Sequence, residues 1–361
     1  MDSSQFYGIA SIAYILAMVA YISYLVFRNS VIGVIATTIT VAGFLSHTVA
    51  FFIRWKEFYE IGQMGLLRGI PLTNLYESLI FFVWCLILGY LIIEWKYKNR
   101  SFGAFITPIA GMALAFIDIS GMSKGIQPLV PALQSNWLLA HVTMSFLSYS
   151  TFALSFGTAL MYLAVHAGDK KSGAYIFWTV TLGIFLGVLI AMGLDFLVFK
   201  ISAKNPESFI QSYLFKASFR SDSGTVVMIS YLALAAFVFL VWQFGYVLRN
   251  LISSFSLSQE MLDELTYKNI AIGFPIFTLG GLIFGAIWAD QAWGKYWSWD
   301  PKETWSLITW FVYAFYLHAR FLRGWRGSKI AIVAVIGFVC TVFTYLGVNL
   351  LLSGLHSYGG Q

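Results

Sequence analysis

Five histidines are the residues of this 361-residue chain best suited to bind a metal, because neutral imidazole is a common ligand of transition metals. They are His47, His141, His166, His318 and His356. The two cysteines, Cys85 and Cys340, stand singly in apolar runs, and the sequence has no Cys-x-x-Cys pair of the kind found in dithiol carriers. We interpret both cysteines as packing residues. Metal chemistry is therefore expected from the histidines.

A tryptophan-rich stretch, WADQAWGKYWSWDPKETWSLITW, is the second feature suited to ligand binding. It holds six of the thirteen tryptophans of the chain, namely Trp288, Trp293, Trp297, Trp299, Trp305 and Trp310. An indole has a flat apolar face and one N–H donor, so such a cluster suits a membrane interface or a planar, partly polar ligand. An ordinary aromatic belt explains only one or two tryptophans at each helix end. The density here indicates a binding function as well.

The centre of this stretch has the pattern of a helix start. Asp300 can accept N–H hydrogen bonds as an N-cap, Pro301 suits the first helical position, and Glu303 is placed to complete a capping box. The pattern predicts an aromatic loop that runs into a sharply defined helix.

The composition predicts an all-α, polytopic integral membrane protein. The chain is 59% hydrophobic and only 11% charged, whereas soluble domains carry about 25% charged residues. The net charge of +6 does not indicate nucleic-acid binding, because the basic residues are dispersed in short loops. No cleavable signal peptide is evident, so the first apolar run is expected to remain as a helix.

Apolar runs long enough to cross a membrane predict about ten transmembrane helices. They fall near residues 6–27, 31–53, 74–94, 102–117, 136–165, 174–198, 225–248, 268–289, 303–321 and 329–352. The loop ends on one side carry twelve of the 22 basic residues, and four of the other ten lie in one long loop. Because basic residues favour the cytoplasmic side, both termini and the tryptophan-rich loop are predicted to be extracytoplasmic.

The predicted depths of the histidines separate them into groups. His141, near the outer end of the fifth run, and His356, just after the last run, can both approach the tryptophan-rich loop. Two imidazoles beside an aromatic surface suit a bis-histidine haem site. His318 lies inside the ninth run, where an ionisable group is a functional candidate, although a histidine bonded to a neighbouring helix is an alternative. For His47, packing inside the bundle is preferred over a role in ligand binding. His166 is interpreted as a helix-end residue.

Two segments, WGKYWSWDPKETWSLITWFVYAFYLHAR and NLLLSGLHSY, resemble the WWD domain of the haem-handling proteins of cytochrome c maturation. Among these, the chain is most similar to the CcsA/ResC subunit of the System II cytochrome c synthase. The resemblance divides the chain into N-terminal helices (1–170, with His141), a probable inserted transmembrane hairpin (171–249) and a WWD core with the C-terminal helices (250–361). An eight-helix family core plus this hairpin gives the ten predicted spans.

The resemblance implies a subunit that binds and delivers haem b and presents it, reduced, for thioether attachment to apocytochromes with a CxxCH motif. It assigns His141 and His356 as axial ligands of the haem iron, and His318 to a second haem site in the membrane. A CcsB/ResB-type membrane subunit is the implied partner. A bacterial inner membrane is favoured, and a thylakoid membrane also agrees with the resemblance.

Residues of the tryptophan-rich stretch are candidates for contact with the haem. Trp293, Trp297, Trp299 and Asp300 are candidates to line the haem edge, although Asp300 can act mainly as a helix cap. The candidate cations for the haem propionates are Lys295 and Lys302, and both can equally extend to the membrane interface. No catalytic nucleophile and base pair is evident, so the reacting thiols are expected to belong to the substrate.

Two other classes of protein are left open. One is the System I branch of haem-handling proteins, although the DPKETWSLITW continuation and the GLHSY ending favour System II. The other is a multispan transporter or a quinone-linked redox subunit with incidental tryptophans. That class predicts charged residues spread through several spans, whereas these spans contain few.

Overall fold

The computed structural model describes most of the chain and contains helices but no β-strand within the described part. The described residues are 2–62, 70–119, 125–126, 135–202, 215–253, 255 and 257–352. The predicted all-α class is confirmed. His356 and most of the predicted loop at 118–135 lie outside the described residues.

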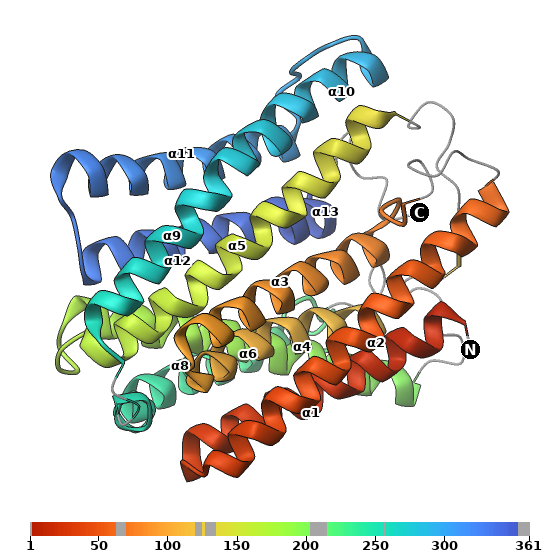
Figure 1. Cartoon of the computed structure of the whole chain (residues 1–361). Coiled ribbons are helices and arrows are strands. Elements are labelled where there is room, and N and C mark those ends of the chain that lie inside the picture. The colour runs from red at the N-terminus through yellow and green to blue at the C-terminus, as the bar shows by residue number, and fades with distance from the viewer. Residues whose placement is uncertain are drawn as a thin grey trace.

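The helices cover the ten predicted apolar runs, although α2 continues nine residues beyond the run at 31–53 and α9 begins nine residues before the run at 268–289 (Figure 1). The long helices are α1 (Ser3–Phe27), α2 (Ser30–Gly62), α3 (Leu75–Tyr97), α4 (Gly103–Ile119), α5 (Asn136–His166), α6 (Gly173–Ser202), α8 (Gly224–Ser253), α9 (Gln259–Phe277), α10 (Gly285–Trp293), α11 (Pro301–Arg323) and α12 (Ser328–Val342). Shorter elements are the 3₁₀-helix η1 (Arg100–Phe102), the π-helices η3 (Thr278–Phe284) and η4 (Phe343–Gly347), and α13 (Val348–Leu351). The α9, η3 and α10 segments form one continuous span, as do α12, η4 and α13.

Eight helical spans in the described ranges are long and apolar enough to cross a membrane. The helices at the predicted runs 102–117 and 303–321 are not among these eight spans. Helix α4 has 17 residues and is about 25 Å long, shorter than the hydrocarbon core of about 30 Å. Helix α11 has 23 residues, but it is strongly amphipathic and carries charged residues in its first and last turns. The polytopic membrane class is confirmed, with two helices that differ from simple apolar spans.

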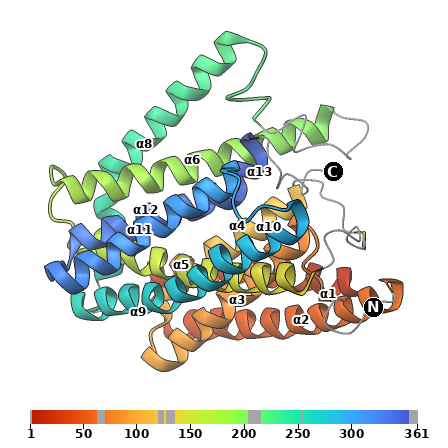
Figure 2. The same ribbon diagram turned by 90° about the horizontal axis from the view of Figure 1, so that it is seen from above.

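Helix α5 forms the centre of the bundle (Figures 1 and 2). It packs against α9, α12 and α3, and nearly every side chain from Ser145 to Ala164 is buried. Many of these residues are serine, threonine, alanine or glycine, which allow neighbouring helices to approach closely in a membrane. In Figure 1, α1 to α4 lie on one side of α5 and α9 and α11 lie on the other, and α12 also packs against α5.

Helices α6 and α8 form a hairpin whose contact is made by small residues. A Cβ atom placed at Gly183 would lie 3.1 Å from the Cα of Val238, and one placed at Gly187 would contact Leu234. Beyond this contact, α8 is largely exposed and leans away from the other helices (Figure 2). The interpretation of residues 171–249 as an inserted hairpin stays a prediction.

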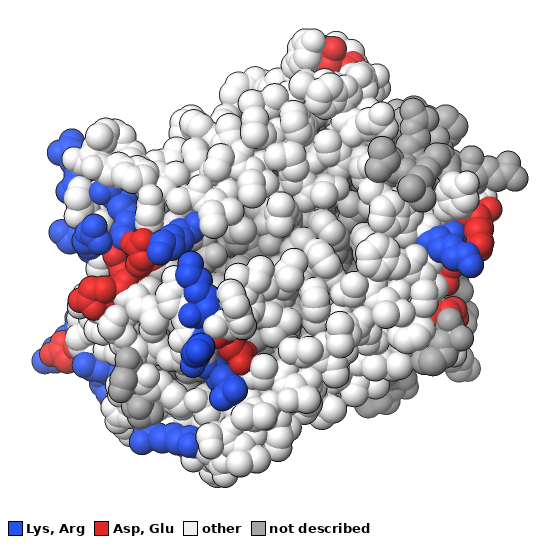
Figure 3. Space-filling model, in the orientation of Figure 1, with Lys and Arg blue, Asp and Glu red and all other residues white. Residues whose placement is uncertain are grey.

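The two ends of the bundle differ in charge. Lysines and arginines gather where α9 begins and α11 ends, whereas few charges lie near α10 (Figure 3). At the basic end, Arg320 donates to Asp263 over 2.7 Å, and both side chains are buried. The first helix begins at the opposite end, which is also the end of α10 and the tryptophan-rich loop (Figure 1). The basic residues thus lie at the end that the sequence predicts to be cytoplasmic.

Candidate functional site

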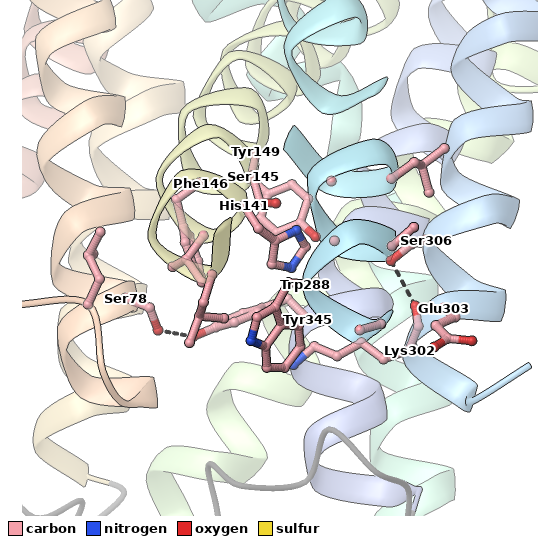
Figure 4. A pocket seen from close by; sticks show the side chains of 18 of the residues that line it. Ser78, His141, Ser145, Phe146, Tyr149, Trp288, Lys302, Glu303, Ser306 and Tyr345 are labelled. Carbon is pink, nitrogen blue, oxygen red and sulfur yellow. Dashed lines mark hydrogen bonds between the residues drawn. The ribbon is translucent and has the colours of Figure 1, made fainter. Parts of the chain in front are cut away.

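A pocket of about 190 Å³ lies at the tryptophan-rich end of the bundle (Figure 4). Its walls come from the beginnings of α3, α5 and α11, from η3 with α10, and from η4 with α13. Segments that lie far apart in the sequence therefore form one site. Among the residues predicted for ligand binding, His141, Trp297 and Lys302 line this pocket.

His141 lies in the second turn of α5, and its Nδ1 atom is 2.7 Å from the carbonyl oxygen of Gly280 in η3. A carbonyl oxygen can only accept, so Nδ1 carries the proton in the neutral imidazole. The lone pair of the ring is then on Nε2, which is a nitrogen that can bind a metal. Trp288 stacks nearly parallel to the imidazole, with ring centroids 6.3 Å apart and 9° between planes.

Two glycines permit this close approach of α5 to the η3 and α10 segments. A Cβ atom at Gly285 would lie 2.9 Å from both Nδ1 and Cε1 of His141, and a Cβ atom at Gly280 would collide with the side chain of Met144. Such contacts are shorter than van der Waals packing allows. A larger residue at either position would therefore force the histidine helix away.

The pocket walls are aromatic, with a few polar groups. Tyr149, Tyr296, Trp297 and Tyr345 contribute rings. The Nε1 atom of Trp297 and the Oγ atom of Ser145 are buried and have no hydrogen-bond partner within the described residues. Buried polar groups are normally satisfied, so these two atoms are suited to bond a ligand or an ordered water in the pocket.

Lys302 provides a positive charge at the pocket. Its Nζ atom donates to Oδ1 of Asn349 over 3.3 Å and lies 5.8 Å from the ring centroid of Tyr345. Lys302 precedes the apolar part of α11, and loss of solvent around the ammonium lowers its pKa to about 8. The side chain is therefore mostly charged at neutral pH and can pair with an anionic group.

The helix start predicted at Asp300 is confirmed. Asp300 accepts from the N–H of Lys302 over 2.9 Å, and Glu303 accepts from the N–H of Asp300 over 3.3 Å, which completes a capping box. The N–H of Ser298 also donates to Glu303 over 2.7 Å. The loop before α11 is therefore held by the first turn of the helix.

The remaining candidates of the stretch do not line the pocket. Trp293 packs edge-on against Trp288, with ring centroids 4.8 Å apart, so it supports the wall from behind. Trp299 has a left-handed backbone with φ of 61° and an indole that is 69% exposed. Lys295 is exposed, and Asp300 is buried in its capping role.

The other histidines lie away from the pocket. His318 is exposed on the outer face of α11, in line with the exposed side chains of Phe311, Phe315 and Leu322. His47 is fully buried between α1 and α2, with Nδ1 3.3 Å from the hydroxyl of Tyr14, in agreement with a packing role. His356, the second predicted axial ligand, is outside the described residues.

Several pocket residues were not found from the sequence. Ser78 at the start of α3 hydrogen-bonds the hydroxyl of Tyr345 in η4, which closes one wall. Ser145 and Asn349 also lie in the pocket. Serine and asparagine in membrane helices often serve only to hydrogen-bond the same or a neighbouring helix, and no local pattern marks these as pocket residues. The signal that was available is the i, i+4 spacing of His141 and Ser145, which places both on one face of α5.

The donor set fits a haem better than an isolated metal ion. In the described ranges, no cluster of three or more histidine, cysteine or acidic residues could hold a metal ion. The pocket instead combines one imidazole with flat aromatic walls, an indole N–H and a cation. Its volume is below the roughly 300–1,000 Å³ of pockets that enclose a drug-sized molecule. The described walls are therefore suited to hold part of a large planar ligand and to leave another part accessible.

Comparison with known proteins places this membrane bundle in a class that assembles cytochromes. The chain matches the family described as "Cytochrome C assembly protein" over residues 72–191 and 224–356, and it belongs to that family. It is similar to proteins named "Cytochrome c biogenesis protein CcsA". The relative from Gloeobacter violaceus is 40% identical over 80% of this chain and 78% of the relative.

Two further CcsA relatives align over greater lengths. The protein of Marchantia polymorpha is 37% identical over 89% of this chain and 88% of the relative, and that of Porphyra purpurea is 36% identical over 95% and 93%. The predicted CcsA-type resemblance is confirmed. The chain is therefore a cytochrome c biogenesis protein, in preference to the transporter or quinone-linked alternatives. The family match omits residues 192–223, which lie within the predicted inserted region.

Proposed function

We propose that this chain is the haem-binding and haem-delivering subunit of a System II cytochrome c synthase. It presents reduced haem b at the extracytoplasmic face for attachment to apocytochromes with a CxxCH motif. The observation that carries the proposal is the position of His141. Its Nδ1 atom is held by the carbonyl of Gly280, which fixes the tautomer with the lone pair on Nε2 that an iron ligand requires, inside an aromatic pocket.

The proposed chemistry needs orientation more than acid–base catalysis. Each cysteine thiol of the apocytochrome adds across a haem vinyl group: a carbon–sulfur bond forms, and the thiol proton passes to the other vinyl carbon. Neither partner is oxidised in this addition. The contribution of this chain is to hold the vinyl edge near the thiols, and such positioning can supply much of the acceleration of a bimolecular step.

The polar groups of the pocket suit the anionic side of haem. Lys302 can pair with a propionate carboxylate, and the indole N–H of Trp297 can donate to one. Trp293 supports Trp288 beside His141. Trp299 and Lys295 are exposed, so they can contact only a part of the haem that projects from the pocket. Asp300 acts by fixing the loop.

His356 is proposed as the second axial ligand because it matches the family position in GLHSY. Docking of an apocytochrome would bring the histidine of its CxxCH motif close to the iron. Exchange of this histidine for a ligand of the synthase would begin product release.

A second haem site is proposed at His318 with a CcsB/ResB-type partner subunit. The side chain is exposed on the outer face of α11, beside the exposed side chains of Phe315 and Leu322. An exposed histidine in an apolar helix face is costly unless it has a partner. A haem shared with a neighbouring subunit would satisfy it.

The proposed orientation in the membrane follows from charge. The basic end of the bundle would face the cytoplasm, which puts the pocket and the WWD motif on the extracytoplasmic side. A bacterial inner membrane is favoured. A thylakoid membrane is the alternative.

The proposal is tested by the absorption spectrum and haem content of the detergent-purified protein, expressed with its partner. Wild type is expected to carry haem with sharp bands on reduction. His141→Ala and His356→Ala should lose the outward haem, and added imidazole should restore it. His47→Ala is the matched control, because His47 is buried in a different part of the bundle. Haem-free wild type in the presence of the partner would refute the proposal.

A further inference from the structure

The π-helix η3 interrupts the span that faces His141. Residues Thr278–Phe284 have π-helical hydrogen bonding, between the α-helical segments α9 and α10. A single π turn inside an α-helix is rare and is frequently found at functional sites, because it inserts one residue and loosens the regular ladder. Pro275, in the last turn of α9 before η3, also weakens the helix, because proline lacks an N–H donor.

The interruption coincides with the contact to the histidine. Gly280, within η3, accepts from Nδ1 of His141 over 2.7 Å, and Gly285, just after η3, leaves room for the ring. Gly280 also lets α5 approach at Met144. A carbonyl in a regular α-helix is directed along the helix toward the N–H four residues on, whereas a loosened turn lets a neighbouring side chain insert.

We propose that Gly280, within the π-helical turn, and Gly285, directly after it, are positioning residues for His141. The Gly280 carbonyl fixes the imidazole as the Nδ1–H tautomer and sets its rotation, and Gly285 provides the space for the ring. The role in haem binding rests on the proposed function. The hydrogen bond between His141 and Gly280, however, is present in the protein without haem.

The first test needs no haem. In apo-protein labelled with ¹⁵N-histidine and placed in lipid nanodiscs, NMR distinguishes protonated from unprotonated ring nitrogens, and His141→Ala identifies the signals of His141. His141 is expected to be the Nδ1–H tautomer at a pH where it is neutral. Protonation of Nε2 in place of Nδ1 would overturn the inference, whatever the outcome of the haem-binding experiment.

The second test changes the residues that position His141 and leaves His141 itself in place. Gly280→Ala is expected to displace α5 at Met144, to lower haem affinity about 10- to 100-fold, and to change the absorption bands of the retained haem. Deletion of Leu279, whose side chain is 45% exposed, removes one residue of the π turn and should give the same change. The double variant Gly280→Ala/Met144→Gly should recover affinity, because glycine lacks the Cβ atom of Met144 that the added methyl group would strike.

Gly273→Ala is the matched control. Gly273 lies on the same α5–α9 contact, where an added Cβ would meet Thr151 and lie 2.8 Å from Cε1 of Phe152, but it is seven residues away from Gly280. If Gly280→Ala and Gly273→Ala lower haem affinity equally, with unchanged bands and no recovery by Met144→Gly, then only helix packing is involved and the inference fails. A failure of the proposed function would appear differently, as wild type without haem.

Discussion

The indoles of Trp297 and Trp299 stand nearly perpendicular, with ring centroids 5.8 Å apart and 86° between planes. Residues two apart on an extended strand normally point to the same side. Here the left-handed backbone of Trp299 turns its indole outward, while Trp297 faces the pocket. The two tryptophans of the WSWD motif thus have different roles.

The first prediction concerns this difference. Trp299→Asn is expected to leave the free energy of unfolding unchanged or to raise it by up to about 1 kcal/mol, because asparagine enters the left-handed region more easily. Trp297→Asn should lower stability and haem retention, because it removes a pocket wall. Thermal unfolding in detergent and haem content measure both effects. Equal losses of haem in the two variants would contradict the assignment.

The second prediction concerns Lys302 and pH. Because its pKa is lowered to about 8, the side chain loses its charge as the pH rises through that value, and an anionic group is then held less well. Haem retention by wild type should fall between pH 7 and pH 9. Lys302→Met should retain haem roughly tenfold less well at pH 7 and show a flatter pH profile.

Lys268→Met is the control for this experiment, since Lys268 is exposed, pairs with Glu264 at the basic end and lies outside the pocket. It should keep the wild-type profile. An unchanged profile in Lys302→Met would remove Lys302 from the site. Haem retention can be followed by transfer to an apo-globin in stopped flow.

The third prediction concerns the basic end of the bundle. Arg320→Met would leave the buried carboxylate of Asp263 without its 2.7 Å partner, and loss of one member of such a pair costs about 3 kcal/mol. The double variant Arg320→Met/Asp263→Leu should recover much of this stability. Lys268→Met breaks only the exposed pair with Glu264 and should change stability by less than about 0.5 kcal/mol. Equal effects of Arg320→Met and Lys268→Met on thermal unfolding would contradict this account.

The sequence predicted the helices well because membrane spans are marked by long apolar runs. It also predicted the helix start at Asp300, where the capping pattern is local. Helix α4 and helix α11 were predicted less well as spans. Burial inside the bundle allows α4 to be short, and the ion pair of Arg320 with Asp263 allows α11 to carry charge.

The pocket was only partly predictable. His141 was found from its predicted depth in the fifth run, and Trp297 and Lys302 were found because they belong to the tryptophan-rich stretch. Ser78 and Tyr345 meet across 267 positions of sequence, so their contact depends on tertiary packing. The π-helix η3 was not predicted, because no simple periodicity marks one extra residue in a helical turn. The outward turn of Trp299 depends on one backbone angle.

The most direct test of the account is the yield of covalent holocytochrome in cells that depend on this chain, measured by haem staining of a CxxCH reporter. His141→Ala is expected to abolish attachment at an unchanged protein level, and imidazole in the medium should restore part of the yield. Full attachment by His141→Ala without imidazole would contradict the central claim that His141 holds the haem for attachment.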